Sequence, residues 1–166
     1  MTPISLGYSC STKDAITAYW REQPNHLFDW AFSPKLEGVI RLLEARCQLG
    51  ELKRDLLEKE GSFFNKDITH KLIFLHHDIV GDPQHAASIQ RKCERLTKLL
   101  DSGKPVLFLR NIFQPEELLR GDEFTQRVQA AYPQARFRIE FAPHLGLEHW
   151  HPGWKEFIEK VKNLVD

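Results

Sequence analysis

The chain has few cysteines, a single methionine and no long hydrophobic run. No apolar stretch approaches the ~20 residues that a membrane-spanning helix needs. Its 23 basic and 23 acidic side chains balance, so it lacks the basic excess that sequence-independent nucleic-acid binding requires. These absences lead us to expect neither a membrane nor a nucleic acid as a partner.

The cysteines are odd in number and widely spaced, at Cys10, Cys47 and Cys93. The first residues also lack the basic and apolar regions of a signal peptide. Together these features predict reduced thiols in a cytoplasmic protein rather than a disulfide framework. The sequence has neither a Gly-x-Gly-x-x-Gly motif nor a P-loop, and we expect no cofactor.

What the chain does contain is an alternation of apolar segments with amphipathic helical patterns. Apolar runs or alternation predict strands near residues 4–6, 71–76, 106–109 and 136–141, with helices over 12–21, 34–47, 86–101, 115–132 and 153–165. Strands that alternate with helices favour a parallel sheet. We therefore expect one three-layer α/β domain over residues 1–166, with a mostly parallel sheet of about four to five strands and helices on both faces.

Two segments carry further expectations. Residues 48–70 fit the alternation poorly, and their leucines suggest a short helix that ends at Gly61. In the helix over 86–101, the apolar face contains Ile89, Cys93, Leu96 and Leu100. The basic side chains of that helix are expected to be solvated; they are Arg91, Lys92, Arg95 and Lys98.

Cys10 lies in a turn between the first strand and the first helix. Gly7 breaks the apolar run, and Ser11 with Asp14 has the spacing of a helix capping box. Free N–H groups and the helix dipole would stabilise a thiolate there and lower its pKa. The alternative is that Cys10 is a small buried apolar residue.

Polar side chains follow each of the four predicted strands: Cys10, then His76-His77-Asp78, then Arg110-Asn111, then His144. The carboxyl ends of parallel strands meet at the edge where α/β proteins bind ligands. A thiol nucleophile needs a base to take its proton. Alternation along a strand turns only one of the paired histidines toward Cys10. We prefer His77 as this base, and His76 and His144 remain alternatives.

Several groups would complete such a site. Asp78 or Asp29 could orient the imidazole, and Arg110 could hold an oxyanion or a substrate carboxylate. The alternative for Arg110 is a salt bridge to a neighbouring carboxylate. We assign Asn111, together with His76 and His144, to substrate binding.

The loop over residues 23–34, between Pro24 and Pro34, is unusually apolar and carries Asp29 and Trp30. It forms either a wall of the site, with Trp30 contacting substrate, or a packing plug whose carboxylate caps nearby backbone. The loop at 148–152 is rich in histidine, and with His144 it offers zinc ligands. It lacks the helical His-x-x-x-His pattern, and we expect no metal.

The residues Ser5-Leu-Gly-x-x-Cys10, Phe28-Asp-Trp30, Phe74-x-His-His-Asp78 and Val106–Arg110 resemble a bacterial family of papain-like cysteine peptidases. The resemblance covers residues 4 to about 110. It implies a Cys-His hydrolase carried by Cys10 and His77, with Asp29 or Asp78 as a third member. The strand-turn-helix position of Cys10 also resembles the nucleophile turn of SGNH-type hydrolases.

We expect a cysteine-dependent hydrolase or acyltransferase that acts on a peptide or small-molecule substrate through a thioester at Cys10. The alternative is a non-catalytic module that binds a small anionic or sugar-like ligand on the same rim. The sequence does not indicate an oligomeric state.

Overall fold

The computed structural model describes residues 1–20, 24–57, 61–143, 145 and 151–165. The strands are β1 (Thr2–Ser5), β2 (Leu52–Leu57), β3 (Ser62–Asp67), β4 (Leu72–Phe74), β5 (Pro105–Asn111) and β6 (Arg136–Ala142). The helices are α1 (Ser11–Tyr19), α2 (Leu36–Glu44), α3 (Pro83–Asp101), α4 (Gly121–Ala131) and α5 (Pro152–Val165), with short 3-10 helices η1 (Leu27–Trp30) and η2 (Pro115–Arg120). Along the part described, no helix is both long and apolar enough to span a bilayer.

The first sheet is parallel and has the order β1-β5-β6. Its central strand β5 is buried on both faces, as its apolar run predicts. Ile4 of β1 pairs with Phe108 of β5, and Phe108 pairs with Ile139 of β6. The expected α/β class with a parallel sheet is therefore confirmed, but this sheet has three strands rather than four to five.

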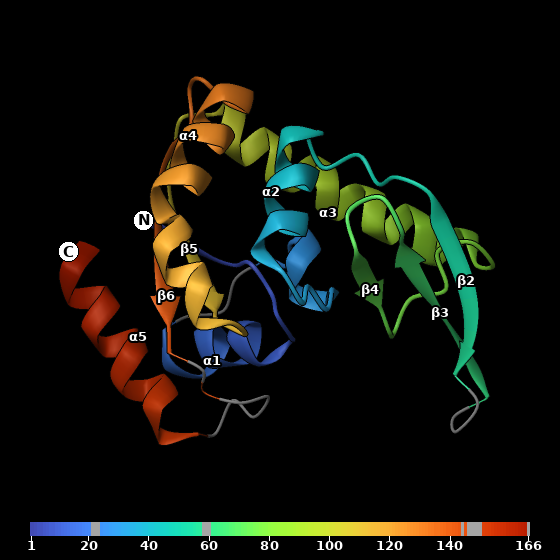
Figure 1. The fold of residues 1–166 in the computed structure, drawn as a ribbon, viewed down its shortest axis with the longest axis horizontal. Coiled ribbons are helices and arrows are strands. Elements are labelled where there is room, and N and C mark those ends of the chain that lie inside the picture. Colours follow the sequence, from blue (N-terminus) through green and yellow to red (C-terminus); the bar gives the residue numbers. More distant parts are fainter. Residues whose placement is uncertain (21–23, 58–60, 144, 146–150, 166) are drawn as a thin grey trace.

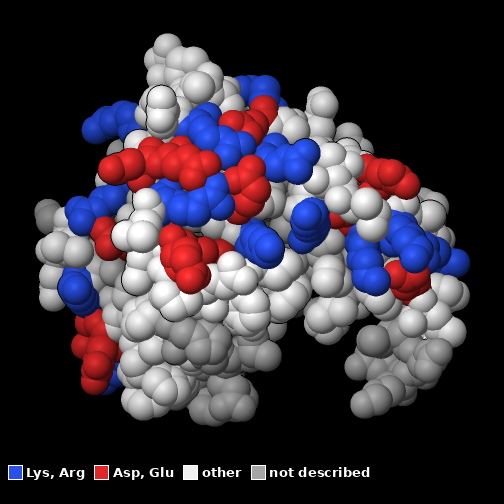
Figure 2. Space-filling model, viewed as in Figure 1, with Lys and Arg blue, Asp and Glu red and all other residues white. Residues whose placement is uncertain are grey.

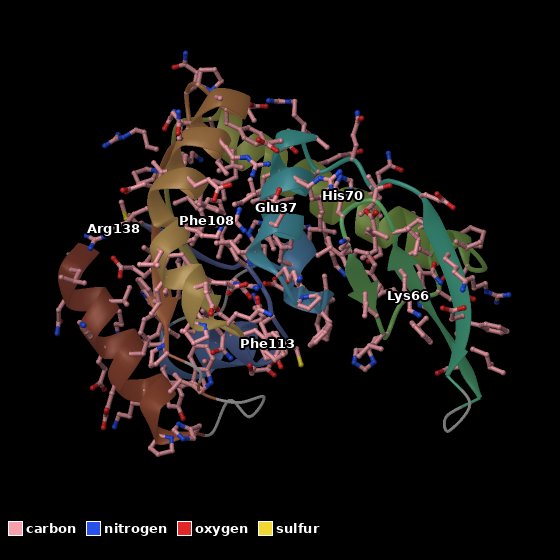
Figure 3. The ribbon with its side chains drawn as sticks, in the orientation of Figure 1. Glu37, Lys66, His70, Phe108, Phe113 and Arg138 are labelled. Carbon is pink, nitrogen blue, oxygen red and sulfur yellow. The ribbon has the colours of Figure 1, made fainter. Side chains whose placement is uncertain are left out.

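Helices cover both faces of the parallel sheet, so the predicted three layers are present (Figure 1). Leu107 and Leu109 face one way and pack with α1 and α5. Phe108 faces the other way, against α4, where its ring lies 5.5 Å from that of Phe124 (Figure 3). Helices α2 and α3 bury their apolar stripes in that same larger core.

The structure contains a second, antiparallel sheet of order β2-β3-β4, which contradicts two of our predictions. The helix suggested within residues 48–70 is wrong, because this segment forms strands β2 and β3. The strand expected over 71–76 exists only as β4, and it pairs antiparallel with β3 instead of joining the parallel sheet. An apolar run indicates a buried strand but carries no information on the direction of its neighbour.

The second sheet is joined to the first core through β4. Leu72 and Phe74 are fully buried in the cluster that contains α2. Phe32 exchanges two backbone hydrogen bonds with Ile73, of 2.8 and 2.9 Å. The loop after η1 therefore lies beside β4, and Figure 2 shows a notch between the two parts of the molecule.

Charges of both signs interleave over α2 and α4 (Figure 2). Arg127 pairs with Glu37, Glu44 and Glu123, and Arg120 pairs with Glu37 and Glu123. These side chains are partly exposed, so each pair contributes about 1 kcal/mol or less. This face carries a balanced network rather than a patch of one sign.

Candidate functional site

The turn before Cys10 has a tightly held backbone. Gly7 and Tyr8 both have positive φ, of 74° and 69°. A Cβ on Gly7 would lie 2.6 Å from the Ser33 hydroxyl oxygen and 3.0 Å from the Ala31 carbonyl oxygen. Ser33 also accepts a 2.9 Å hydrogen bond from the Tyr8 N–H. The chain folds back on itself here because glycine leaves room for the loop after η1.

Cys10 is the N-cap of α1, and its carbonyl accepts the first helical bond from the Asp14 N–H at 3.0 Å. The predicted helix start is therefore correct to one residue, although Ser11 is the first helical residue rather than the cap. The Ser9 and Ser11 hydroxyls lie 2.7 Å apart across this cap. The Cys10 side chain makes no capping hydrogen bond to the first N–H groups of α1.

A small hollow of about 70 Å³ opens beside the thiol. It is lined by Ser9, Cys10, Trp30, Ala31, Phe32, Leu75 and His76. These residues come from the β1–α1 turn, from η1 and the loop after it, and from the turn after β4. The structure thus brings Cys10, Trp30 and His76 together.

The pKa of the Cys10 thiol is raised, whereas we expected it to be lowered. Cys10 is exposed, yet partial burial raises its pKa above the ordinary value, and the Asp14 carboxylate raises it further. A hydrogen bond from the Cys10 backbone N–H lowers the pKa of the thiol, but this is the smallest of the three effects. The predicted lowering by the helix N-terminus is therefore wrong, and the thiol is protonated at neutral pH.

His77 is not among the residues that line the hollow, and it lies in a cluster with Lys92, His85 and Trp30. Its Nε2 lies 3.3 Å from the Lys92 Nζ, and its ring lies 5.4 Å from that of His85 and 6.3 Å from that of Trp30. Burial, together with the charges of Lys92 and the two neighbouring histidines, lowers its pKa to about 4. His76, our second choice, is therefore the histidine that lines the hollow together with Cys10.

Asp29 lies within this buried cluster, one residue before Trp30. Its Oδ2 accepts a 2.6 Å hydrogen bond from the His26 N–H and lies 3.7 Å from the Lys13 Nζ. Burial raises its pKa to about 6, against the opposing effects of these partners and of Lys92. The carboxylate thus ties η1 to the first turn of α1, three residues beyond Cys10, as the packing interpretation of this loop predicts.

Asp78 is occupied within the second sheet. Its carboxylate accepts hydrogen bonds from both Nε and Nη2 of Arg54, at 2.6–3.0 Å, and also from Asn65 and the Gly81 N–H. The bonds from Arg54 are the main reason that its pKa falls to about 2. Asp78 therefore pins the turn after β4 to β2, and the structure does not assign it to orienting His77.

Arg110 is fully buried and uses all five of its N–H groups inside the protein. Two bind the Glu117 carboxylate, one binds the Leu6 carbonyl, and two bind Ser33 through its hydroxyl and carbonyl oxygens. We expected a substrate contact here, and the salt bridge that we considered as an alternative is what the structure shows. Arg110 holds the Gly7 turn and Ser33 in place instead of facing a ligand.

We also assigned Asn111 and His144 to substrate binding. Asn111 is not among the residues that line the hollow. Asn111 is buried, and its Oδ1 accepts a 3.3 Å hydrogen bond from the Leu145 N–H. His144 lies outside the described residues, as do most of the histidine-rich loop and the zinc ligands considered there. Phe113, two residues beyond Asn111, stacks on Tyr8 at 4.8 Å near α1 (Figure 3).

The sequence did not identify two buried lysines, Lys13 beside Asp29 and Lys92 beside His77. Lys13 and Lys92 are each only 8% exposed. We placed Lys92 on a solvated face, but it is buried on the same face of α3 as Ile89 and Leu96. Its spacing of three residues from Ile89 and four from Leu96 is the signal that identifies it.

The fold and site define a class: an α/β domain with a cysteine at the cap of the helix after its first strand, beside an imidazole. A family model described as "putative papain-like cysteine peptidase" matches residues 2–144, and the chain belongs to this family. The match supports a cysteine hydrolase as the general class. Comparisons with curated proteins and with solved structures gave no match.

Proposed function

We propose that the protein is a cysteine hydrolase or acyltransferase in which His76 activates the Cys10 thiol. The observation that carries the proposal is the shared hollow, because it places a thiol, an imidazole and an indole on the walls of one small space. Family membership supports the thiol as the reacting group. The hollow has room for a small acyl group or the end of a peptide side chain.

Because the pKa of Cys10 is raised, the base must remove the thiol proton during the attack on the substrate. Because the resting thiol is protonated, His76 takes the proton as Sγ forms its bond to the acyl carbon. The imidazolium then gives this proton to the leaving amine or alkoxide, and a thioester remains on Cys10. Water or a second acceptor next attacks the thioester, with His76 as the base again, and the thiol is restored.

Two features of the turn would assist this reaction. N–H groups in the first turn of α1 would hold the oxyanion that develops on the acyl oxygen, beyond that of Ser11, which donates to the Ser9 hydroxyl. Trp30 closes one side of the hollow and limits the access of water. The Arg110 network fixes both features indirectly, since it holds the Leu6 carbonyl and Ser33.

Incubation with p-nitrophenyl acetate tests the proposal. We expect release of p-nitrophenol and an acetyl group that peptide mapping places on Cys10. Cys10→Ser and Cys10→Ala should abolish the adduct, whereas Cys93→Ala, which removes a thiol away from the hollow, should leave it unchanged. Equal release by Cys10→Ala and the wild type would exclude the mechanism.

A non-catalytic binding module is the second candidate, and one observation favours it. A thiol whose pKa is raised is not activated before substrate arrives. Saturable binding of a small ligand at the hollow, without acylation of Cys10 by any ester or peptide substrate tested, would decide for this alternative.

A further inference from the structure

The structure contains a second cavity, of about 600 Å³, between α3 and the segment that follows α2. It shares no lining residue with the hollow beside Cys10, whose volume is about 70 Å³. Its walls come from residues 46–49, from Ile79 after β4, and from the side of α3 that runs from Ala86 to Lys98. Small-molecule sites usually have volumes of about 300–1,000 Å³, so this cavity has room for a ligand.

The floor of the cavity is apolar. Leu49, Ile79 and Ile89 line it, and all three are part of the main core or pack against it. Cys47 and Cys93 line it as well, and burial raises the pKa of these thiols to about 11 and about 12. Both thiols are therefore uncharged at neutral pH, and the cavity presents an uncharged surface to a ligand.

The charged side chains at the cavity balance one another. The Arg46 guanidinium donates hydrogen bonds to the Asp101 carboxylate at 2.5 Å and to the Ala131 carbonyl at 3.0 Å. Glu94 and Lys98 are exposed, opposite in charge and four residues apart on α3, which places them on the same side of the helix. These four charges sum to zero, and a charged group placed on the apolar floor would lose its hydration.

The wall formed by residues 46–49 is held in place by its own contacts. Arg46 and Cys47 both have positive φ, of 53° and 60°. The Cys47 N–H donates to the Leu42 carbonyl at 2.8 Å, and the Thr97 hydroxyl of α3 donates to the Arg46 carbonyl at 3.3 Å. Residues other than glycine stay in this left-handed region only where the surrounding structure holds them. The cavity is therefore formed without a ligand.

We propose that this cavity binds an uncharged, largely apolar small molecule. The exposed amides of Gln48 and Gln90 line it and can bind a hydroxyl or carbonyl group of that molecule. A flat protein surface fits less well, because the large apolar side chains that the described chain exposes lie outside this cavity. The site is separate from Cys10, so the inference does not rest on the proposed function.

Two dyes that share the same rings test the proposal. N-phenyl-1-naphthylamine is uncharged at pH 7, and 1-anilinonaphthalene-8-sulfonate differs from it by one sulfonate group. The fluorescence of both dyes rises in apolar surroundings. We expect saturable binding of the uncharged dye at one site per chain, and binding of the sulfonate that is about tenfold weaker or more, because its charge must be desolvated.

NMR of isoleucine methyl groups labelled with carbon-13 locates the bound dye. The methyl resonances of Ile79 and Ile89 should shift through the ring currents of the dye, over the same concentrations at which the fluorescence saturates. The resonance of Ile158, which packs in the separate core beside α5, should stay in place. Ile79→Val and Ile89→Val assign the two resonances.

A variant that narrows the cavity gives an independent test. Ala86→Trp should weaken binding of the uncharged dye about fivefold or more, since the indole takes up part of the space. Ala87→Trp is the matched control, because Ala87 is exposed and does not line the cavity. Cys10→Ala should bind the dye as the wild type does.

Equal affinity for the two dyes, or fluorescence that rises without saturation, would overturn the inference. Resonances of Ile79 and Ile89 that stay fixed while the fluorescence rises would overturn it as well. Both comparisons use the wild-type chain, so neither needs the Ala86 variant to fold. Unchanged binding in a folded Ala86→Trp protein would also count against this site.

Discussion

Replacing Arg110 by methionine should destabilise the protein severely. The substitution removes five hydrogen bonds and leaves Glu117, which is 4% exposed, as a buried carboxylate without its cation. Breaking a buried ion pair in this way costs about 3–5 kcal/mol. Because a domain of this size is typically stable by only about 5–15 kcal/mol, this loss is a large fraction of the total.

Urea unfolding followed by tryptophan fluorescence measures the effect. Arg120→Met is the control, since Arg120 pairs with Glu37 and Glu123 at the surface and its loss should cost about 1 kcal/mol or less. The double variant Arg110→Met/Glu117→Leu should recover only part of the loss, because Glu117 also accepts a 2.8 Å hydrogen bond from the Leu36 N–H. An Arg110→Met protein as stable as the Arg120→Met control would refute this account of the network.

Three further predictions concern the turn and the cluster. Asp14→Asn should lower the pKa of Cys10 and speed its alkylation by iodoacetamide at pH 7, and an unchanged rate would count against the Asp14 field. Gly7→Ala should lower the free energy of unfolding by about 2 kcal/mol or more, because alanine is strained at positive φ and its Cβ would clash with Ser33. Gly61→Ala is the control in urea unfolding: Gly61 also has positive φ but has open space around it, so the loss should be only about 1 kcal/mol. The folded pKa of His77, about 4, lies below the unfolded value, so the unfolded chain binds the proton more tightly. This group should therefore reduce stability as pH falls from 6.5 to 4, and a proton NMR titration of His77 with a midpoint near 6.5 would contradict this.

The parallel half of the fold could be predicted because its signals are local. The apolar run at 106–109 identifies a buried strand, and the short apolar segment from Ile4 to Leu6, ended by Gly7, indicates another. The alternation over 136–141 correctly indicates a strand at the sheet edge. The antiparallel half was missed because its strands are half exposed. Leu52 and Leu56 are spaced by four residues, which suits a helix, yet they lie on a strand with Leu56 exposed.

The turn that carries Cys10 could be predicted from the sequence, but the histidine that shares its hollow could not. We chose between His76 and His77 by strand alternation, but β4 ends at Phe74 and the two histidines follow in a turn. Alternation does not apply beyond the end of a strand, so the sequence could not decide which ring faces Cys10. Arg110 donates hydrogen bonds to Leu6, Ser33 and Glu117. No local sequence pattern connects Arg110 with Leu6 or Ser33, which lie far from it along the chain.

The rate at which p-nitrophenyl acetate acylates Cys10 tests the central claim most directly, measured in His76→Gln and His77→Gln proteins. The account predicts a loss of about 100-fold or more for His76→Gln, the contribution of a general base, and a change within a few-fold for His77→Gln. A large loss in His77→Gln with normal acylation in His76→Gln would contradict the account.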